Sequence, residues 1–207
     1  QSVYSSRVRA GSILAEKYPV DADLVIGVPE SGLAAAVGYS QGSNIPYGMA
    51  FYKNSYVGRT FIKPKQNERT AGVQAKLNVI RDVVKGKRVV MVDDSIVRGT
   101  TIRNIVKMLK DAGALEVHVR ISSPPFKHPC YYGTDVPSSE NLVAVNNTID
   151  EIKESINADS LGFLDIEDLG QLCPGLDYCD ACFTGKYAGG IPSDPSKTNS
   201  CSSKIVL

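Results

Sequence analysis

The most informative stretch of the chain is a predicted strand that ends at two adjacent carboxylates. Residues 88–92 read Arg-Val-Val-Met-Val, and Asp93 and Asp94 follow them directly. A turn of Ser, Gly and Thr residues then leads into residues 102–109, where apolar side chains recur at the spacing of an amphipathic helix. A buried strand followed by a helix that returns across the sheet is the repeating unit of an α/β fold.

The rest of the chain alternates short apolar runs with helical patterns in the same way. Predicted strands cover residues 24–28, 47–52, 88–92 and 116–121. Predicted helices cover residues 5–18, 33–39, 73–84, 102–109 and 149–156, and a short apolar element covers 161–166. This order predicts an α/β fold with a doubly wound parallel sheet and a small Cys-containing C-terminal region.

Composition restricts the classes of protein to which the chain can belong. Its 207 residues are enough for one domain, and 43% hydrophobic with 22% charged residues is the balance of a globular protein with a core. Lys and Arg number 23 against 22 Asp and Glu, so no positive field indicates binding to nucleic acid or to an anionic membrane. No apolar run approaches the roughly 18 residues that a membrane-spanning helix needs.

The turn after the two carboxylates has the features of a phosphate site. Ligands of open α/β sheets bind at the carboxyl ends of strands, and the N-terminus of a helix favours an anion. The hydroxyls of Ser95, Thr100 and Thr101 can add hydrogen bonds, and Gly99 lets the backbone approach closely. Two carboxylates beside a phosphate site would repel an anionic ligand unless they bind a diol, a divalent cation or both. A phosphorylated ribose with Mg²⁺ has all of these groups. The plainer alternative is that Asp93 and Asp94 only cap the next helix.

Other phosphate-binding motifs do not fit this sequence. It contains no G-x-x-x-x-G-K-[ST] loop, and no G-x-G-x-x-G follows a predicted strand. A phospho-acceptor receiver domain would place its acidic residues after the first strand and would lack the Gly-Thr-Thr turn.

In the two carboxylates and the turn that follows them, the chain resembles the type I phosphoribosyltransferases, and among these the amidophosphoribosyltransferase family. The Asp-Asp string resembles their signature for phosphoribosyl pyrophosphate (PRPP). The resemblance extends from residue 1 to about residue 187 through five separated segments. These segments are Val25–Gly32, Lys53–Ile62, Val89–Thr101, Ser122–Pro125 and Cys182–Tyr187.

The resemblance implies a role for each matching segment. Pro29–Gly32 resembles the pyrophosphate loop, in which Glu30 and Ser31 are candidate contacts and Ser31 is associated with Mg²⁺. Asp93 and Asp94 match the position that binds Mg²⁺ and the ribose diol. The 5′-phosphate loop would comprise Ser95, Ile96, Val97, Arg98, Gly99, Thr100 and Thr101.

The basic stretch from Lys53 to Arg69 resembles a mobile loop that closes over PRPP. It contains five Lys and Arg residues, and Lys53, Tyr56 and Arg59 are the candidate catalytic contacts with pyrophosphate. Closure would shield an oxocarbenium-like intermediate from water. Without the resemblance, the alternative interpretation of this stretch is a solvated basic loop, and that of Ser31 is a helix N-cap.

The reaction implied by the resemblance is attack of ammonia on C1 of the ribose as pyrophosphate leaves, giving 5-phosphoribosylamine for purine synthesis. Ammonia is already a nucleophile, so neither His118 nor His128 is expected to do chemistry. A phosphoribosyltransferase for a nucleobase would need a base-binding hood, which the sequence does not show. A PRPP-sensing regulator without catalysis remains as an alternative, although no helix-turn-helix pattern accompanies the fold.

Five cysteines concentrate toward the end of the chain, and Cys179 and Cys182 form a C-x-x-C. With no secretory signal, reduced thiols or metal ligands are expected in a cytoplasmic protein. One branch of the resembled family carries a [4Fe–4S] cluster, and Cys130, Cys179 and Cys182 match three of its ligands. The fourth lies upstream of residue 1, and Cys173 is a candidate substitute. Zn²⁺ and unligated thiols are the alternatives, and Cys201 is expected to be free.

The resemblance also implies a domain organisation. Residues 1–170 are expected to form the phosphoribosyltransferase domain, residues 171–188 a Cys-rich segment packed on it, and residues 189–207 a disordered tail. The family's glutaminase domain, which supplies ammonia from glutamine, would precede Gln1, and no Cys before residue 130 could serve as its nucleophile. The expected partners are PRPP, ammonia, that domain and further copies in a homo-oligomer, without nucleic acid or membrane.

Overall fold

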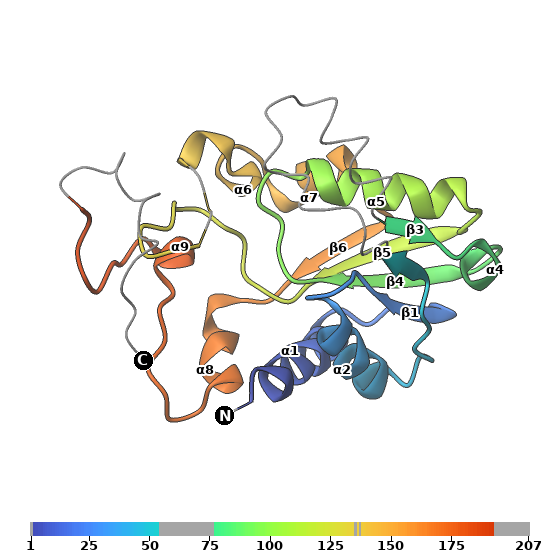
Figure 1. Cartoon of the computed structure of the whole chain (residues 1–207), viewed down its shortest axis with the longest axis horizontal. Coiled ribbons are helices and arrows are strands. Elements are labelled where there is room, and N and C mark those ends of the chain that lie inside the picture. The colour runs from blue at the N-terminus through green and yellow to red at the C-terminus, as the bar shows by residue number, and fades with distance from the viewer. Residues whose placement is uncertain (1, 54–76, 135, 137, 193–207) are drawn as a thin grey trace.

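A four-stranded parallel sheet forms the centre of the molecule in the computed structural model, which describes residues 2–53, 77–134, 136 and 138–192 (Figure 1). The strand order is β1 (Leu24–Gly27), β4 (Arg88–Asp93), β5 (Glu116–Ile121) and β6 (Ser160–Phe163). Leu24 pairs with Val89, Arg88 with Glu116, and His118 with Ser160. The predicted parallel sheet is therefore confirmed.

Helices cover both faces of this sheet, as in a doubly wound fold (Figure 1). On one face lie α1 (Val3–Lys17) and α2 (Leu33–Ser43). On the other lie α5 (Thr100–Asp111), α6 (Val143–Asn146) and α7 (Ile149–Ser155). The remaining elements are β2 (Phe51–Lys53), β3 (Leu77–Val79), α4 (Arg81–Val84), the 3₁₀ turns η2 (Ser139–Asn141) and η3 (Ile166–Asp168), α8 (Leu169–Leu172) and α9 (Ala181–Thr184).

The alternation of side chains along β4 explains why its sequence is apolar throughout. Val90 and Val92 pack with α1 and α2, whereas Val89 and Met91 pack with the core on the side of α5. Successive side chains of a strand point to opposite faces, so a strand covered on both faces must be apolar at every position. In α5 the residues at helical spacing, Ile102 to Leu109, turn toward this second core, as predicted.

The two connections that follow β1 place the next segments of chain on opposite sides of this strand. After α2 it returns to the free edge of β1, where Tyr47 forms a parallel bridge with Val25. After β3 and α4 it crosses to the opposite edge of β1 and enters β4. The carboxyl ends of β1 and β4 therefore lie at a topological switch point, which is where open α/β sheets bind their ligands.

The predicted strand over 47–52 is divided between that bridge and β2. β2 leaves the main sheet and pairs antiparallel with β3, with Phe51 opposite Val79 and Lys53 opposite Leu77. The predicted helix over 73–84 is wrong over its described residues, because 77–79 form this strand and only 81–84 are helical. Leu77 is buried and Asn78 is exposed, so burial alternates with the period of a strand, and cross-strand pairing with β2 outweighs the helical spacing.

The helices α1 and α2 pack closely because glycine allows their backbones to approach. A Cβ placed on Gly38 would lie 1.8 Å from the carbonyl oxygen of Val8, and one on Gly11 would lie 1.8 Å from that of Ala35. Ser12 donates a hydrogen bond from its hydroxyl to the Gly38 carbonyl at 3.2 Å in the same contact. No helix in the described part of the chain is long and apolar enough to cross a membrane.

We expect Gly38→Ala to destabilise the fold by about 1–3 kcal/mol, because the methyl group forces apart two packed backbones. Chemical denaturation monitored by circular dichroism measures this change. Gly170→Ala is the matched control, since its Cβ would meet only the Tyr178 hydroxyl at 3.7 Å. Equal stability of the two variants would contradict the proposed packing.

Candidate functional site

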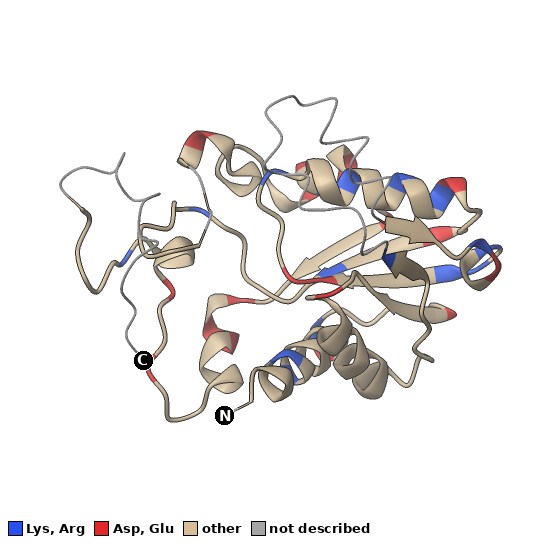
Figure 2. Ribbon diagram, in the orientation of Figure 1, with Lys and Arg blue, Asp and Glu red and all other residues tan. Residues whose placement is uncertain are grey.

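The two loops predicted to bind the ligand lie side by side at the switch point. The loop at 29–32 follows β1, and the loop at 93–99 follows β4, with its acidic residues visible in Figure 2. The N–H of Val28 donates to the carbonyl of Val92 at 2.9 Å, and the N–H of Gly32 donates to that of Val28 at 3.0 Å. A Cβ on Gly32 would lie 2.4 Å from the Val92 oxygen, so only glycine permits this approach.

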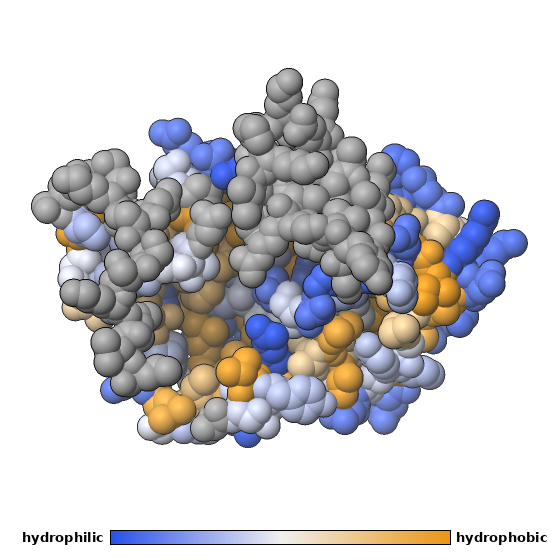
Figure 3. All heavy atoms as spheres, viewed as in Figure 1, coloured by the Kyte–Doolittle hydropathy of each residue, from blue (hydrophilic) through white to orange (hydrophobic). Residues whose placement is uncertain are grey.

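The paired carboxylates differ in their surroundings. Asp93 is 9% exposed, whereas Asp94 is half-buried. Burial, and then the charge of Asp94, raise the pKa of Asp93 to about 8, although the Asp94 N–H donates to its Oδ1 at 2.8 Å. Ser95 donates from its hydroxyl to Oδ1 of Asp94 at 2.9 Å. The site thus holds one buried acid and one accessible carboxylate, and Figure 3 shows hydrophilic residues in the hollow of the same region.

The predicted phosphate loop leads into the N-terminus of α5. Gly99 has a φ of +78°, a left-handed conformation that glycine adopts without strain, and the exposed Thr100 and Thr101 begin the helix. The N-terminal N–H groups of a twelve-residue helix and these hydroxyls are suitable donors to a phosphate. Arg98 is exposed beside them.

Two of the seven predicted loop residues turn their side chains into the protein. Ile96 is 3% exposed and belongs to the core on the α5 side, and Val97 packs against the cluster around Phe126. The carbonyl of Val97 accepts a hydrogen bond from the N–H of Val143 at 2.9 Å. These two residues therefore anchor the loop, and only their backbones are available to a ligand.

The structure brings one residue of the predicted mobile loop to the site. Nζ of Lys53, at the end of β2, lies 2.6 Å from Oε1 of Glu30 in the loop after β1. The Lys53 side chain is 32% exposed and that of Glu30 is 74% exposed. Ser31 is half-buried next to Glu30. The other two candidate catalytic residues, Tyr56 and Arg59, lie outside the described residues.

The donor set at the switch point fits Mg²⁺. Two carboxylates and a serine hydroxyl offer only oxygen atoms, the ligands that Mg²⁺ prefers, and Mg²⁺ commonly keeps other positions for water and substrate phosphate. No group of three or more His, Cys, Asp or Glu side chains that could hold a metal ion occurs among the residues that the structure describes. A cation at Asp93 and Asp94 would thus depend on substrate oxygens for the rest of its ligands.

Cys130 and Cys182, two of the predicted cluster ligands, lie in two segments that are hydrogen-bonded to each other. The N–H groups of Lys127 and His128 both donate to the carbonyl of Cys182, at 3.1 and 3.0 Å. The rings of Phe126 and Phe183 lie 5.0 Å apart between centroids. Cys130 and Cys182 both pack against the apolar cluster that includes Val97.

The thiols of this region perturb one another. Burial, and then the charge of Cys130, raise the pKa of Cys182 to about 11, with Cys179 adding to the effect. Burial alone would raise the pKa of Cys130, but the N–H groups of Tyr132 and Thr134 donate to its sulfur and lower it overall. Cys173 lies against α1 instead, with its sulfur 4.0 Å from Oγ of Ser6. Among the described residues no three His, Cys, Asp or Glu side chains are grouped so that they could hold a metal ion, so the structure does not place Cys130, Cys179 and Cys182 as a metal site.

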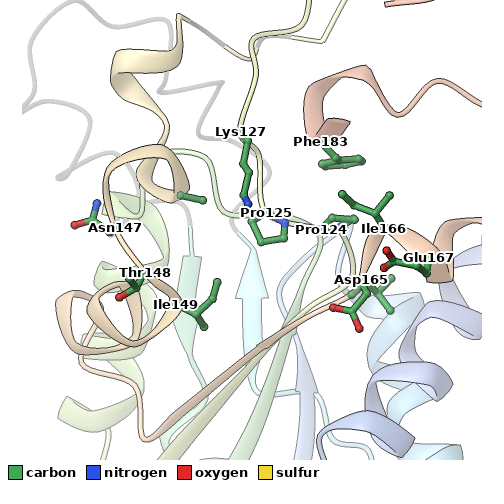
Figure 4. Close-up of a pocket in the computed structure, with 12 residues that line it drawn as sticks. Pro124, Pro125, Lys127, Asn147, Thr148, Ile149, Asp165, Ile166, Glu167 and Phe183 are labelled. Carbon is green, nitrogen blue, oxygen red and sulfur yellow. The ribbon is translucent and has the colours of Figure 1, made fainter. Parts of the chain in front are cut away.

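A cavity of about 350 Å³ lies at the carboxyl ends of β5 and β6, and the sequence analysis did not identify it (Figure 4). Its walls come from the segments after β5 and β6, from the α6–α7 turn and from α9. The lining residues are Pro124, Pro125, Lys127, Ala144, Asn147, Thr148, Ile149, Leu164, Asp165, Ile166, Glu167 and Phe183. None of the predicted site residues that the structure describes lines this cavity. Only packing between distant segments creates it, so no local motif could reveal it.

The raised pKa of Asp93 predicts a stability cost that depends on pH. An acid whose pKa is raised on folding binds its proton more tightly in the folded state, so stability falls as pH rises from about 4 to about 8. We expect Asp93→Asn to be more stable than the unsubstituted chain by about 0.5–2 kcal/mol at pH 8.5 without Mg²⁺, and by less at pH 5. Chemical denaturation at both pH values measures this gap in the free energy of unfolding between Asp93→Asn and the unsubstituted chain. The exposed Asp177→Asn is the control, and a gap that does not widen with pH would contradict the assignment.

Comparison with known proteins adds independent information about this site. Residues 9–132 match the model of the phosphoribosyl transferase domain. The amidophosphoribosyltransferase of Synechocystis is 54% identical over 195 residues, which are 93% of this chain and 39% of that protein. The Bacillus subtilis amidophosphoribosyltransferase is 52% identical over 200 residues, or 93% of this chain and 42% of that protein.

Solved structures agree with these relatives. The structure of an allosteric regulatory enzyme of purine biosynthesis superposes with a TM-score of 0.83 at 52% identity, over 94% of this chain and 43% of that one. The glutamine PRPP amidotransferase from B. subtilis in complex with ADP and GMP gives a TM-score of 0.80, over 90% of this chain and 42% of that one. The chain thus spans about two fifths of the length of the curated relatives that it matches. The chain belongs to the phosphoribosyl transferase domain family.

Proposed function

We propose that this chain carries out the phosphoribosyl transfer of an amidophosphoribosyltransferase. In this reaction ammonia attacks C1 of PRPP, the C1–O bond to pyrophosphate breaks, and the new C1–N group loses a proton to pyrophosphate or to water, which gives 5-phosphoribosylamine and pyrophosphate. The product would enter purine synthesis. Relatives of that name that are about 50% identical over most of the chain support the proposal.

The observation that carries the proposal is the meeting of two loops at the switch point between β1 and β4. One loop places Glu30 and Ser31 at the end of β1, and the other places Asp93 and Asp94 ahead of the N-terminus of α5. A ligand that spans them needs a phosphate at one end, a diol between and a second anionic group near Lys53. PRPP has these three parts in this order.

Each part of the site then has a distinct task. The N-terminal N–H groups of α5, with Thr100 and Thr101, hold the 5′-phosphate. Asp94 accepts hydrogen bonds from the ribose hydroxyls. Lys53 stabilises the negative charge that develops on the departing pyrophosphate. Asp93 and Asp94 would hold Mg²⁺, which would supply positive charge to balance that of the leaving group.

The reaction requires no strong general base, and neither histidine of the chain is placed to act as one in the part of the site that the structure describes. His118 is 6% exposed, and its ring nitrogens lie 3.0 Å from Oγ of Ser160 and 2.9 Å from Oε2 of Glu116. Burial lowers the pKa of His118, which keeps it neutral within the sheet. The attacking ammonia brings its own lone pair, so the residues need only position the reactants.

Asp94→Asn tests this proposal directly. Loss of a charge-assisted hydrogen bond to the diol is expected to weaken PRPP binding roughly 10- to 100-fold. The measurements are calorimetric binding of PRPP with Mg²⁺, and pyrophosphate release with excess ammonium at alkaline pH, where more of it is free ammonia.

Glu167→Gln is the control, because Glu167 lines the separate cavity. It should bind PRPP and release pyrophosphate as the unsubstituted chain does. Binding of PRPP without ammonium-dependent turnover would favour a regulator that senses PRPP. Unchanged binding in Asp94→Asn would contradict the assignment of the diol site.

We also propose that Cys130, Cys179 and Cys182 are three ligands of an iron–sulfur cluster, with Cys173 as the candidate within this chain for the fourth position. Iron–sulfur clusters are bound through cysteine thiolates, usually four. The hydrogen bonds that lower the pKa of Cys130 favour its thiolate. A cluster here would cross-link the loop after β5 to α9, which already contact each other through Phe126 and Phe183.

Anaerobic reconstitution with iron and sulfide tests the cluster. We expect Cys130→Ser and Cys182→Ser to lower the bound iron and acid-labile sulfide to background, whereas Cys201→Ser retains them. Cys173→Ser tests whether that residue substitutes as the fourth ligand. Unchanged iron content in Cys130→Ser, or zinc in place of iron, would contradict the proposal.

The remaining expectations follow from the relatives. Because the chain spans only part of their length, we propose that a glutaminase domain in the same protein supplies the ammonia from glutamine. A cytoplasmic location, a homo-oligomer and the three-part division at residues 170 and 188 also remain proposals. Residues 193–207 of the expected tail lie outside the described residues.

A further inference from the structure

We propose that Glu30 is a positioning residue that competes with pyrophosphate for Lys53. Its carboxylate would bind the Lys53 ammonium in the empty site, give it up when pyrophosphate arrives, and take it back when pyrophosphate leaves. The inference rests on the proposed function, because it assigns the region of Lys53 to the leaving group.

The geometry of the pair supports this assignment. Nζ of Lys53 lies 2.6 Å from Oε1 of Glu30, although the two residues belong to different segments, the end of β2 and the loop after β1. Both backbones are fixed locally, since Lys53 pairs with Leu77 of β3, and Gly32 donates to the Val28 carbonyl at 3.0 Å. The side chains therefore meet over the loop assigned to pyrophosphate.

The Lys53–Glu30 pair changes the charge that is available to bind pyrophosphate. Glu30 adds a third carboxylate to the sheet edge that already carries Asp93 and Asp94. While Glu30 holds the Lys53 ammonium, that charge is neutralised and is not available to an incoming pyrophosphate until the pair separates. The carboxylate thus lowers the affinity of the site for a free anion.

The pair is also weak enough to separate. The Glu30 side chain is 74% exposed, so its carboxylate is readily hydrated when it gives up the ammonium. An exposed ion pair of this kind changes the equilibrium constant between the paired and the separated state by only about two- to fivefold. A factor of this size does not prevent binding, and it favours release of the product, a step that limits turnover in many enzymes.

The Lys107–Asp111 pair shows how an ordinary surface pair differs. Its atoms lie 2.5 Å apart, but both residues belong to α5 and are spaced four residues apart, so the pair forms from local helix geometry. The Lys53–Glu30 pair instead joins two segments that are distant in the fold's connectivity, the end of β2 and the loop after β1, and the family resemblance assigns both to pyrophosphate. Asp111→Asn is therefore a matched control, because it breaks a similar pair outside the site.

The test is calorimetric binding of inorganic pyrophosphate with excess Mg²⁺ to the full chain. We expect Glu30→Gln to bind about two- to fivefold more tightly than the unsubstituted chain, and Asp111→Asn to bind equally. Glu30→Asp, which keeps the charge on a shorter side chain, should also bind more tightly, because it reaches Lys53 less well. Raising the salt concentration should reduce the gain, since it screens the pair.

A double-mutant cycle with Lys53→Gln separates competition from simple repulsion. If Glu30 acts through Lys53, the gain from Glu30→Gln disappears in the Lys53→Gln background. A gain that persists there, or no gain in Glu30→Gln alone, would overturn the inference. Absence of pyrophosphate binding to the unsubstituted chain would instead count against the proposed function.

Discussion

The pairing of β1 with β4 is the constraint on which the rest of the site depends. The two strands are distant in sequence, yet the register from Leu24–Val89 to Gly27–Val92 places their carboxyl ends side by side. Because the chain travels to opposite edges of the sheet from β1, the loops after these strands diverge and leave a place for a ligand between them. Gly32 allows the two loops to approach each other, and the hydrogen bond from the Val28 N–H to the Val92 carbonyl holds the ends of β1 and β4 together.

Placing a carboxylate at the end of a buried strand has a cost. The strand β4 is apolar on both faces because both are covered, so Asp93 enters the same environment as the valines before it. This burial, together with the charge of the neighbouring Asp94, raises the pKa of Asp93 to about 8. A structural role would not require two adjacent acids here, so this unfavourable arrangement supports the proposal that the two carboxylates bind a diol or a cation.

The region that bears the cysteines and the predicted phosphate loop are mechanically connected. Val97 packs in the same cluster as Phe126, Cys130 and Cys182, while its carbonyl accepts a hydrogen bond from the start of α6. Ala144 of α6 lines the cavity at the ends of β5 and β6. The geometry of the phosphate loop is therefore set on one side by the sheet and on the other by packing that includes the proposed cluster ligands.

The sequence by itself determined the features that depend on neighbouring residues. The strand–turn–helix unit from Arg88 to Leu109 follows from apolar periodicity and turn residues, and the position of Asp93 and Asp94 follows from it. Tertiary structure alone decided that Leu77–Val79 is a strand, because its partner in β2 is distant in sequence and outweighs a helical spacing. The same holds for the Lys53–Glu30 pair and for the cavity at Pro124. Each is formed by segments that meet only when the chain folds, since a contact between distant residues leaves no periodic signal in either one.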